Sequence, residues 1–128
     1  MYKRQGLDIV VSVLPLTPET TGIMNAGFFG MLADGAFIIN GGRGPQVDDD
    51  DLLAALDSGK LGGAALDVFA VEPLPQDHPF WTHPKVRVWP HVAAQTNATS
   101  AAEQVAAAIT AMMDGSEPAN RVDWSRGY

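Results

Sequence analysis

The chain has 128 residues, a formal net charge of -7 and no cysteine. The missing cysteines exclude a disulfide framework and a thiolate metal site, and the negative charge argues against nucleic acid, which requires a basic surface. An apolar share of 46% is enough to fill one hydrophobic core. No apolar run approaches a membrane span and no signal-peptide segment opens the chain, so we expect a soluble, cytoplasmic protein without a membrane partner.

Apolar runs and helical patterns alternate along the chain. In chain order, we expect a strand at residues 8–14, a short helix at 25–32 capped by Asn25, a strand at 36–40, an amphipathic helix at 48–58, strands at 64–69 and 86–89, and a long helix at 97–113. The spacing of Ser100 and Glu103 fits a capping box, so the last helix has a second possible start further along. Strands that alternate with helices predict an α/β fold with a parallel sheet.

Two groups of residues raise the question of a metal ion. The acidic run 48–51 opens a predicted helix, where carboxylates stabilise the positive end of the helix dipole. His78 and His83 lack the spacing of a zinc pair on a helix, and we expect them in a loop around Phe80 and Trp81. We therefore predict no metal site.

Three polar residues each follow a predicted strand: Arg43 in N-G-G-R-G, Glu72 in E-P-L-P and His91 in W-P-H. The carboxyl ends of parallel strands open on one crevice, where ligands bind. An arginine can fork onto a substrate carboxylate, and an imidazole held by a carboxylate can protonate a forming alkoxide. The three residues are therefore suited to the reduction of a 2-keto acid.

Three motifs in this order resemble the C-terminal half of a D-2-hydroxyacid dehydrogenase: N-G-G-R-G at 40–44, L-D-V-F-A-V-E-P-L-P at 66–75 and W-P-H-V-A-A-Q-T at 89–96. The segment V-L-P-L-T-P-E-T-T-G and the final D-W-S-R-G-Y are similar to the glyoxylate/hydroxypyruvate reductase subgroup. The resemblance implies the second half of a doubly wound parallel, Rossmann-type sheet. It also implies NADP or NAD as the cofactor, whose reduced form (NADPH or NADH) transfers a hydride to a small 2-keto acid, glyoxylate or hydroxypyruvate. For the full-length protein it implies a homodimer.

The same resemblance implies a role for individual residues. Arg43 would anchor the substrate carboxylate, Glu72 would orient the proton donor His91, and Asp67 would accept from the nicotinamide carboxamide. The residues expected to contact the cofactor are Leu14, Pro15, Leu16, Gly41, Gly42, Arg43, Asp67 and His91. The glycines among them would let the backbone approach the nicotinamide.

The chain lacks the G-x-G-x-x-G pattern that binds the pyrophosphate of a dinucleotide. We therefore expect an incomplete sheet and a fragment, either a truncated gene product or an incompletely read gene, that is inactive alone. Residues 1–115 are expected to be the C-terminal part of the NAD(P)-binding domain, and residues 116–128 a tail that returns toward a substrate domain. The alternatives are a non-catalytic cofactor-binding or interaction module and an inert truncated fragment.

Overall fold

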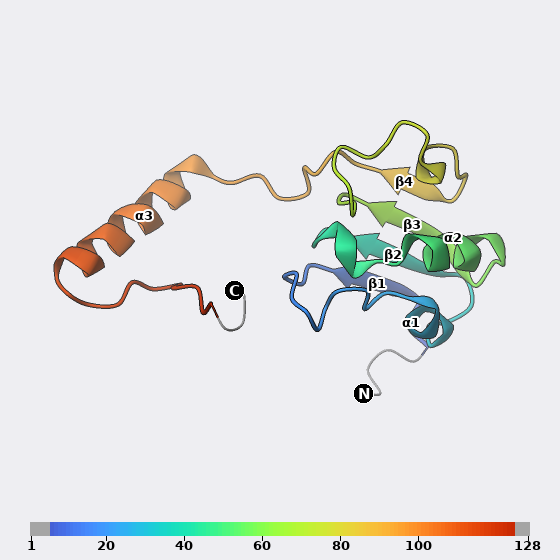
Figure 1. Cartoon of the computed structure of the whole chain (residues 1–128), viewed down its shortest axis with the longest axis horizontal. Coiled ribbons are helices and arrows are strands. Elements are labelled where there is room, and N and C mark those ends of the chain that lie inside the picture. The colour runs from blue at the N-terminus through green and yellow to red at the C-terminus, as the bar shows by residue number, and fades with distance from the viewer. Residues whose placement is uncertain (1–5, 125–128) are drawn as a thin grey trace. The chain divides into compact units, whose positions relative to one another are not determined.

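The structure is a computed structural model that describes residues 6–124. Its elements, shown in Figure 1, are β1 (Ile9–Ser12), α1 (Ala26–Gly30), β2 (Ala36–Asn40), the 3-10 helix η1 (Gly44–Gln46), α2 (Asp49–Asp57), β3 (Leu61–Leu66), the 3-10 helix η2 (Pro79–Trp81), β4 (Val86–Val88) and α3 (Ala98–Met113). They fall into two compact units, Met1–Ala93 and Ala94–Tyr128. No helix in the part of the chain described here is long and apolar enough to cross a bilayer.

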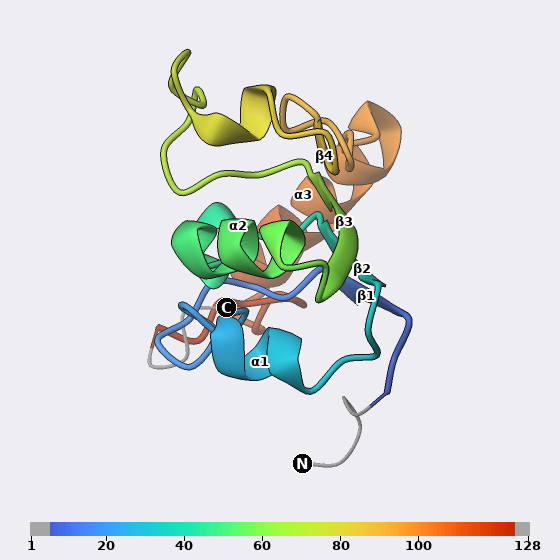
Figure 2. The same ribbon diagram turned by 90° about the vertical axis from the view of Figure 1, so that its right-hand side faces the viewer.

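The first unit is a four-stranded parallel sheet in the order β1-β2-β3-β4. Helices α1 and α2 lie on the same face of this sheet (Figure 2). The predicted α/β fold with a parallel half-sheet is thereby confirmed. Its strand β1 is an edge strand that pairs only with β2 among the described residues.

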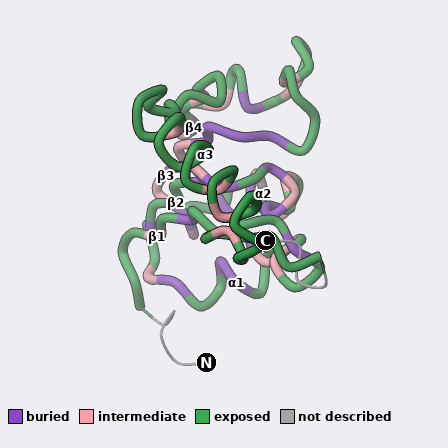
Figure 3. The backbone as a smooth tube through the Cα atoms, turned by 90° about the vertical axis from the view of Figure 1, so that its left-hand side faces the viewer, coloured by how far each residue is buried: buried purple, intermediate pink, exposed green. Residues whose placement is uncertain are grey.

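Successive side chains of a strand point to opposite faces of the sheet, and here one face is buried and the other is exposed. In β2, Ala36, Ile38 and Asn40 are buried, whereas Phe37 and Ile39 are exposed. The buried side chains pack against apolar residues of the helices in one core. Figure 3 marks the buried residues along the backbone, on the strands, on the two helices and on the loops that join them. The main helical contributors are Phe28 and Phe29 of α1 and Leu52 and Leu56 of α2. The opposite face of the sheet carries exposed apolar side chains at Ile9, Val11, Val13, Phe37 and Ile39.

Helix α1 begins at its predicted capping residue Asn25, and α2 begins after Asp48, the first residue of the acidic run. Asn25 accepts from the Phe28 nitrogen at 3.2 Å, and Asp48 accepts from the Asp51 nitrogen at 3.0 Å. The acidic run therefore lies at the N-terminus of α2, where it complements the helix dipole. Asp51 also accepts from the Ala26 nitrogen at 2.7 Å and so joins α2 to the start of α1.

The structure differs from the sequence prediction at several boundaries. β1 covers Ile9–Ser12 rather than 8–14, α1 covers Ala26–Gly30 rather than 25–32, and β4 ends at Val88 rather than at 89. Strand β3 covers Leu61–Leu66 rather than 64–69, because the chain leaves the ladder at Asp67 and because two glycines belong to the strand. Helix α3 begins directly after Asn97, whose side chain accepts from the Thr99 and Ser100 nitrogens at 3.1 Å, so the alternative later start is wrong. The division into a domain at 1–115 and a tail at 116–128 stays a prediction.

The second unit contains α3, none of whose residues is buried. Its exposed apolar side chains include Val105, Ile109 and Met112, and Gly115 follows its end in a left-handed conformation with a φ of 73°. This glycine therefore ends the helix that the sequence predicted at 97–113.

Candidate active site

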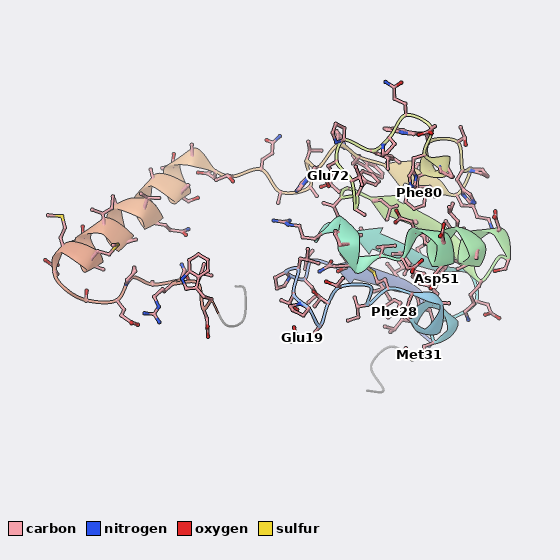
Figure 4. All side chains as sticks on the ribbon, viewed as in Figure 1. Glu19, Phe28, Met31, Asp51, Glu72 and Phe80 are labelled. Atoms are coloured by element: carbon pink, nitrogen blue, oxygen red, sulfur yellow. The ribbon has the colours of Figure 1, made fainter. Side chains whose placement is uncertain are left out.

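The three predicted catalytic residues lie on the loops that follow β2, β3 and β4. Arg43 comes three residues after the end of β2, and His91 three residues after the end of β4. Glu72 lies on the loop after β3, at the end of the sheet where the strands finish (Figure 4). Parallel strands have their carboxyl ends at one edge of the sheet, so the three loops lie at the same edge although they are far apart in the sequence.

Glu72 and His91 form a direct pair across two loops. His91 Nδ1 lies 2.8 Å from Glu72 Oε2, and the other carboxylate oxygen accepts from the Phe69 nitrogen at 2.9 Å. The hydrogen bond with His91, followed by the one from the Phe69 N–H, lowers the pKa of Glu72 below its ordinary value, and the Arg43 charge lowers it further. The pairing leaves His91 Nε2 as the ring nitrogen available to another group.

We expect the substitution Glu72→Gln to remove a pH-dependent part of the stability of the chain. Because the folded pKa of Glu72 lies below its unfolded value, its carboxylate stabilises the fold above the unfolded pKa, and this contribution is lost as pH falls through the folded pKa. Thermal unfolding midpoints should therefore differ most between wild type and variant near neutral pH, and should converge as the pH falls through the lowered folded pKa of Glu72.

The control for this prediction is Glu103→Gln, which removes an exposed carboxylate from α3. Its midpoint should follow that of the wild type throughout the titration. A gap between wild type and Glu72→Gln that stays constant down to the acid end would contradict a stabilising carboxylate at this position.

The backbone of His91 adopts an unusual conformation that Asp67 holds in place. Its φ of 56° lies in the left-handed region, which costs a non-glycine residue on the order of 1 kcal/mol or more. The buried Asp67 carboxylate accepts from the next two backbone nitrogens, those of Val92 and Ala93, each at 2.9 Å. This double hydrogen bond fixes the chain just after His91 and thereby sets the direction of the imidazole.

The backbone of Arg43 is anchored while its side chain is exposed. The buried Asn40 side chain donates to the Arg43 carbonyl at 3.1 Å and accepts from the Gly42 nitrogen at 3.0 Å. The guanidinium donates to the Gly42 carbonyl at 2.7 Å, and none of the carboxylates described in the structure forms a salt bridge with it. Arg43 therefore has donors free for an anionic group.

Two hollows lie beside these loops. The larger, of about 440 Å³, is lined by Ile39, Asn40, Gly41, Ala65, Asp67, Trp89, Val92 and Ala93. The smaller, of about 190 Å³, is lined by Phe69, Glu72, Pro73, Leu74, Trp81, Val88, Trp89, Pro90 and His91. Of the residues predicted to bind the cofactor, Gly41 and Asp67 share the larger hollow, His91 lines the smaller one, and Leu14 lines another hollow beside α1.

The histidines outside this cluster have structural partners. His78 caps η2 by accepting from the Phe80 nitrogen at 3.3 Å, and His83 lies 3.2 Å from Asp57. Phe80 is almost completely buried, as expected for an aromatic plug in this loop.

Sequence comparison places this geometry in a known family. A parallel half-sheet with polar groups at its carboxyl edge defines the class of nucleotide-binding α/β domains. Residues 5–93 match the family described as D-isomer specific 2-hydroxyacid dehydrogenase, NAD binding domain. The chain belongs to this family, and the matched region is its NAD(P)-binding domain.

Curated relatives and solved structures agree with this assignment. The chain is 50% identical over 123 residues to glyoxylate/hydroxypyruvate reductase A of Serratia proteamaculans, covering 96% of the chain and 39% of the relative. A D-isomer specific 2-hydroxyacid dehydrogenase from Xanthobacter autotrophicus, in complex with NADPH and MES, superposes with a TM-score of 0.91 at 48% identity, over 94% of this chain and 50% of that one.

A second solved structure is the NADPH-dependent glyoxylate/hydroxypyruvate reductase of Sinorhizobium meliloti, in complex with NADP and sulfate. It has a TM-score of 0.89 and 42% identity, over 94% of this chain and 40% of that one. The chain thus spans about two fifths of the length of the reductases it matches.

Proposed function

We propose that this chain supplies the nicotinamide-side half of the active site in an NAD(P)-dependent 2-hydroxyacid dehydrogenase that reduces glyoxylate or hydroxypyruvate. One observation carries the proposal: His91 Nδ1 lies 2.8 Å from Glu72 Oε2. This pair lies at the sheet edge that also holds the Arg43 loop. The names of the relatives from Serratia and Sinorhizobium support this substrate class.

The larger hollow suits the nicotinamide end of the cofactor, which supplies the hydride when bound. Its volume of about 440 Å³ lies within the range of small-molecule pockets. Gly41 and Ala93 keep part of its wall small, and each oxygen of Asp67 has a second lone pair that can accept from a carboxamide N–H. Leu14, Pro15 and Leu16 would contact the nicotinamide or its ribose, and NADP bound to the relatives favours NADP as the cofactor.

The roles of the three loop residues follow from their chemistry. The free donors of Arg43 would bind the substrate carboxylate in a forked pair and polarise the adjacent carbonyl. His91 Nε2 would deliver a proton to the carbonyl oxygen as the carbon accepts hydride, which gives the 2-hydroxy acid. Glu72 would fix the imidazole orientation through Nδ1.

A hybrid enzyme tests the proposal. The N-terminal part of the Serratia proteamaculans relative, joined to this chain, should oxidise NADPH in the presence of glyoxylate. In that hybrid, Arg43→Gln and His91→Gln should each lower kcat/KM by roughly 10²-fold or more, because one loses the carboxylate anchor and the other the proton donor. The 128-residue chain by itself should stay roughly a hundredfold or more below the hybrid, since a displaced reacting group alone has an effect of that size.

Arg87→Gln is the matched control, because Arg87 is exposed on β4 and bonds only to neighbouring backbone carbonyls in the described structure. Its hybrid should keep the activity of the unsubstituted hybrid. A hybrid that binds NADPH without turning over would support the alternative of a non-catalytic cofactor-binding module. Full activity in His91→Gln would remove His91 as the proton donor.

A further inference from the structure

Gln46, the last residue of η1, uses every hydrogen-bonding position of its side chain. It is completely buried. Its Oε1 accepts from the Ser12 hydroxyl at 3.1 Å and from the Arg43 nitrogen at 3.2 Å. Its Nε2 donates to the Leu14 and Pro15 carbonyls, both at 3.0 Å. A carboxamide offers two donors and two acceptor positions, so this one is fully satisfied.

Three of these hydrogen bonds reach from the loop after β2 to the end of β1 and the loop behind it, at Ser12, Leu14 and Pro15. The fourth holds the Arg43 nitrogen within the loop of Gln46 itself. Gln46 therefore links the two chain segments beyond the backbone hydrogen bond from the Gly41 nitrogen to the Ser12 carbonyl at 2.9 Å. The space between the loops is fully occupied: a Cβ on Gly42 would lie 2.6 Å from Gln46 Oε1 and 2.9 Å from the Leu14 carbonyl oxygen. Position 42 is therefore a glycine because Gln46 and Leu14 occupy the space that a side chain would need.

Arg43 receives its backbone support from two buried amides. Gln46 accepts from its nitrogen, and Asn40 donates to its carbonyl at 3.1 Å. Both amide side chains are fully buried, whereas the Arg43 side chain is exposed. Because the backbone of Arg43 is anchored, its exposed, positively charged guanidinium starts from a fixed position.

We propose that Gln46 is a positioning residue that fixes the separation between Arg43 and the Leu14–Pro15 segment. This inference rests on the proposed function, in which Arg43 binds the substrate carboxylate and Leu14–Pro15 contacts the nicotinamide. In such a site the separation of the two loops sets the separation of keto carbon and hydride donor. A displacement of about 1 Å can lower a rate by roughly 10²-fold, so one side chain that spans both loops controls the reaction geometry without touching the reacting atoms.

Amide hydrogen exchange on the 128-residue chain tests the inference directly. Gln46→Met keeps the length of the side chain and removes all four hydrogen bonds. The protection of the Arg43 amide should then fall by about tenfold or more relative to the amides of β2, because its acceptor is gone. If Gln46→Met only destabilised the fold as a whole, the protection of all core amides would fall together. Gln76→Met, on an exposed loop position, is the matched control and should change neither.

Gln46→Glu provides a second variant that keeps the shape of the side chain. Its carboxylate retains the acceptors for Ser12 and Arg43 but faces two carbonyl oxygens without a donor. Burial and these oxygens raise the pKa of a carboxyl group at this place, so at low pH the protonated form again donates. While the carboxyl group is ionised, its repulsion from the two carbonyl oxygens should separate the loops and lower the protection of the Arg43 amide. This protection should recover as pH falls in Gln46→Glu and not in Gln46→Met. Unchanged Arg43 protection in both variants would overturn the inference.

Titration with oxamate, an unreactive analogue of a 2-keto acid, separates this inference from the proposed function. In the hybrid enzyme with NADPH present, Arg43→Gln and Gln46→Met should both weaken oxamate binding by roughly tenfold, measured as inhibition of glyoxylate reduction. If the active hybrid does not bind oxamate, or binds it equally well with Arg43→Gln, the proposed function is contradicted. If Arg43→Gln weakens binding and Gln46→Met leaves it unchanged, only the positioning role of Gln46 is overturned.

Discussion

Gly44→Ala should destabilise the chain by about 3 kcal/mol, whereas Gly41→Ala should be nearly neutral. A Cβ on Gly44 would overlap the Phe69 carbonyl group and the Ala70 nitrogen, which are backbone atoms and cannot rotate away. A Cβ on Gly41 would have its nearest neighbours at 3.8 and 3.9 Å, an ordinary contact distance. The two glycines stand three positions apart in one loop and therefore form a matched pair. Urea unfolding of both variants, followed by circular dichroism, measures the difference.

We expect Gly44→Ala to lower the activity of the site as well as the stability of the fold. Gly44 follows Arg43, and Phe69 both precedes the Glu72 loop and donates its N–H to the Glu72 carboxylate. The extra methyl group must therefore push the arginine loop away from the loop that holds the Glu72–His91 pair. In the hybrid enzyme, Gly44→Ala should lower kcat/KM by roughly 10²-fold, the expected effect of a shift near 1 Å. Equal stability of Gly44→Ala and Gly41→Ala would show that the two loops are not in close contact.

We also expect the isolated chain to self-associate through strand β1. This strand lies at the edge of the sheet, where an unpaired backbone is a template for another chain. Its side chains at Ile9 and Val11 extend the exposed apolar face formed with Phe37 and Ile39, their neighbours in register. Only Asp8 offers a charge at the start of the strand.

Val11→Lys should convert the associated chain to a monomer, as measured by light scattering at micromolar concentration. Val11 is 57% exposed in the middle of β1, so a lysine there is tolerated by the fold and blocks the edge and the apolar face. Gln76→Lys adds the same charge on an exposed loop and should leave association unchanged. A monodisperse monomer for the unsubstituted chain would contradict the prediction.

The sequence predicted every strand of the sheet but misplaced β3, and the reason lies in the two glycines of this strand. Residues 61–63 read as Leu-Gly-Gly, and glycine is a weak strand residue. In the structure a Cβ on Gly62 would overlap the Gly35 carbonyl oxygen, and one on Gly63 would lie 2.7 Å from the Phe37 ring. The glycines therefore belong to the strand because a neighbouring strand and its aromatic ring come close, a tertiary cause that has no trace in a propensity pattern.

The residues of the candidate site were also predictable only in part, because some of their supports come from distant parts of the chain. Glu72 and His91 were found because each follows an apolar strand, and their pairing is confirmed. Asn40 was missed as a support for the Arg43 loop, although it shares the alternation of Ala36 and Ile38 and so belongs to the buried face. Gln46 left no comparable signal, because its two carbonyl partners, Leu14 and Pro15, lie more than thirty residues earlier in the chain, on the loop after β1.

The strands of this sheet stand side by side in the order in which they are synthesised. During translation the sheet can therefore grow at one edge, since each new strand finds its neighbour already made. β1, β2 and α2 are complete before Glu72 leaves the ribosome, and His91 emerges only after β4, the last strand. The imidazole–carboxylate pair is thus the final part of the sheet edge to assemble, and a nascent chain that stops before residue 91 has the arginine loop but not the imidazole.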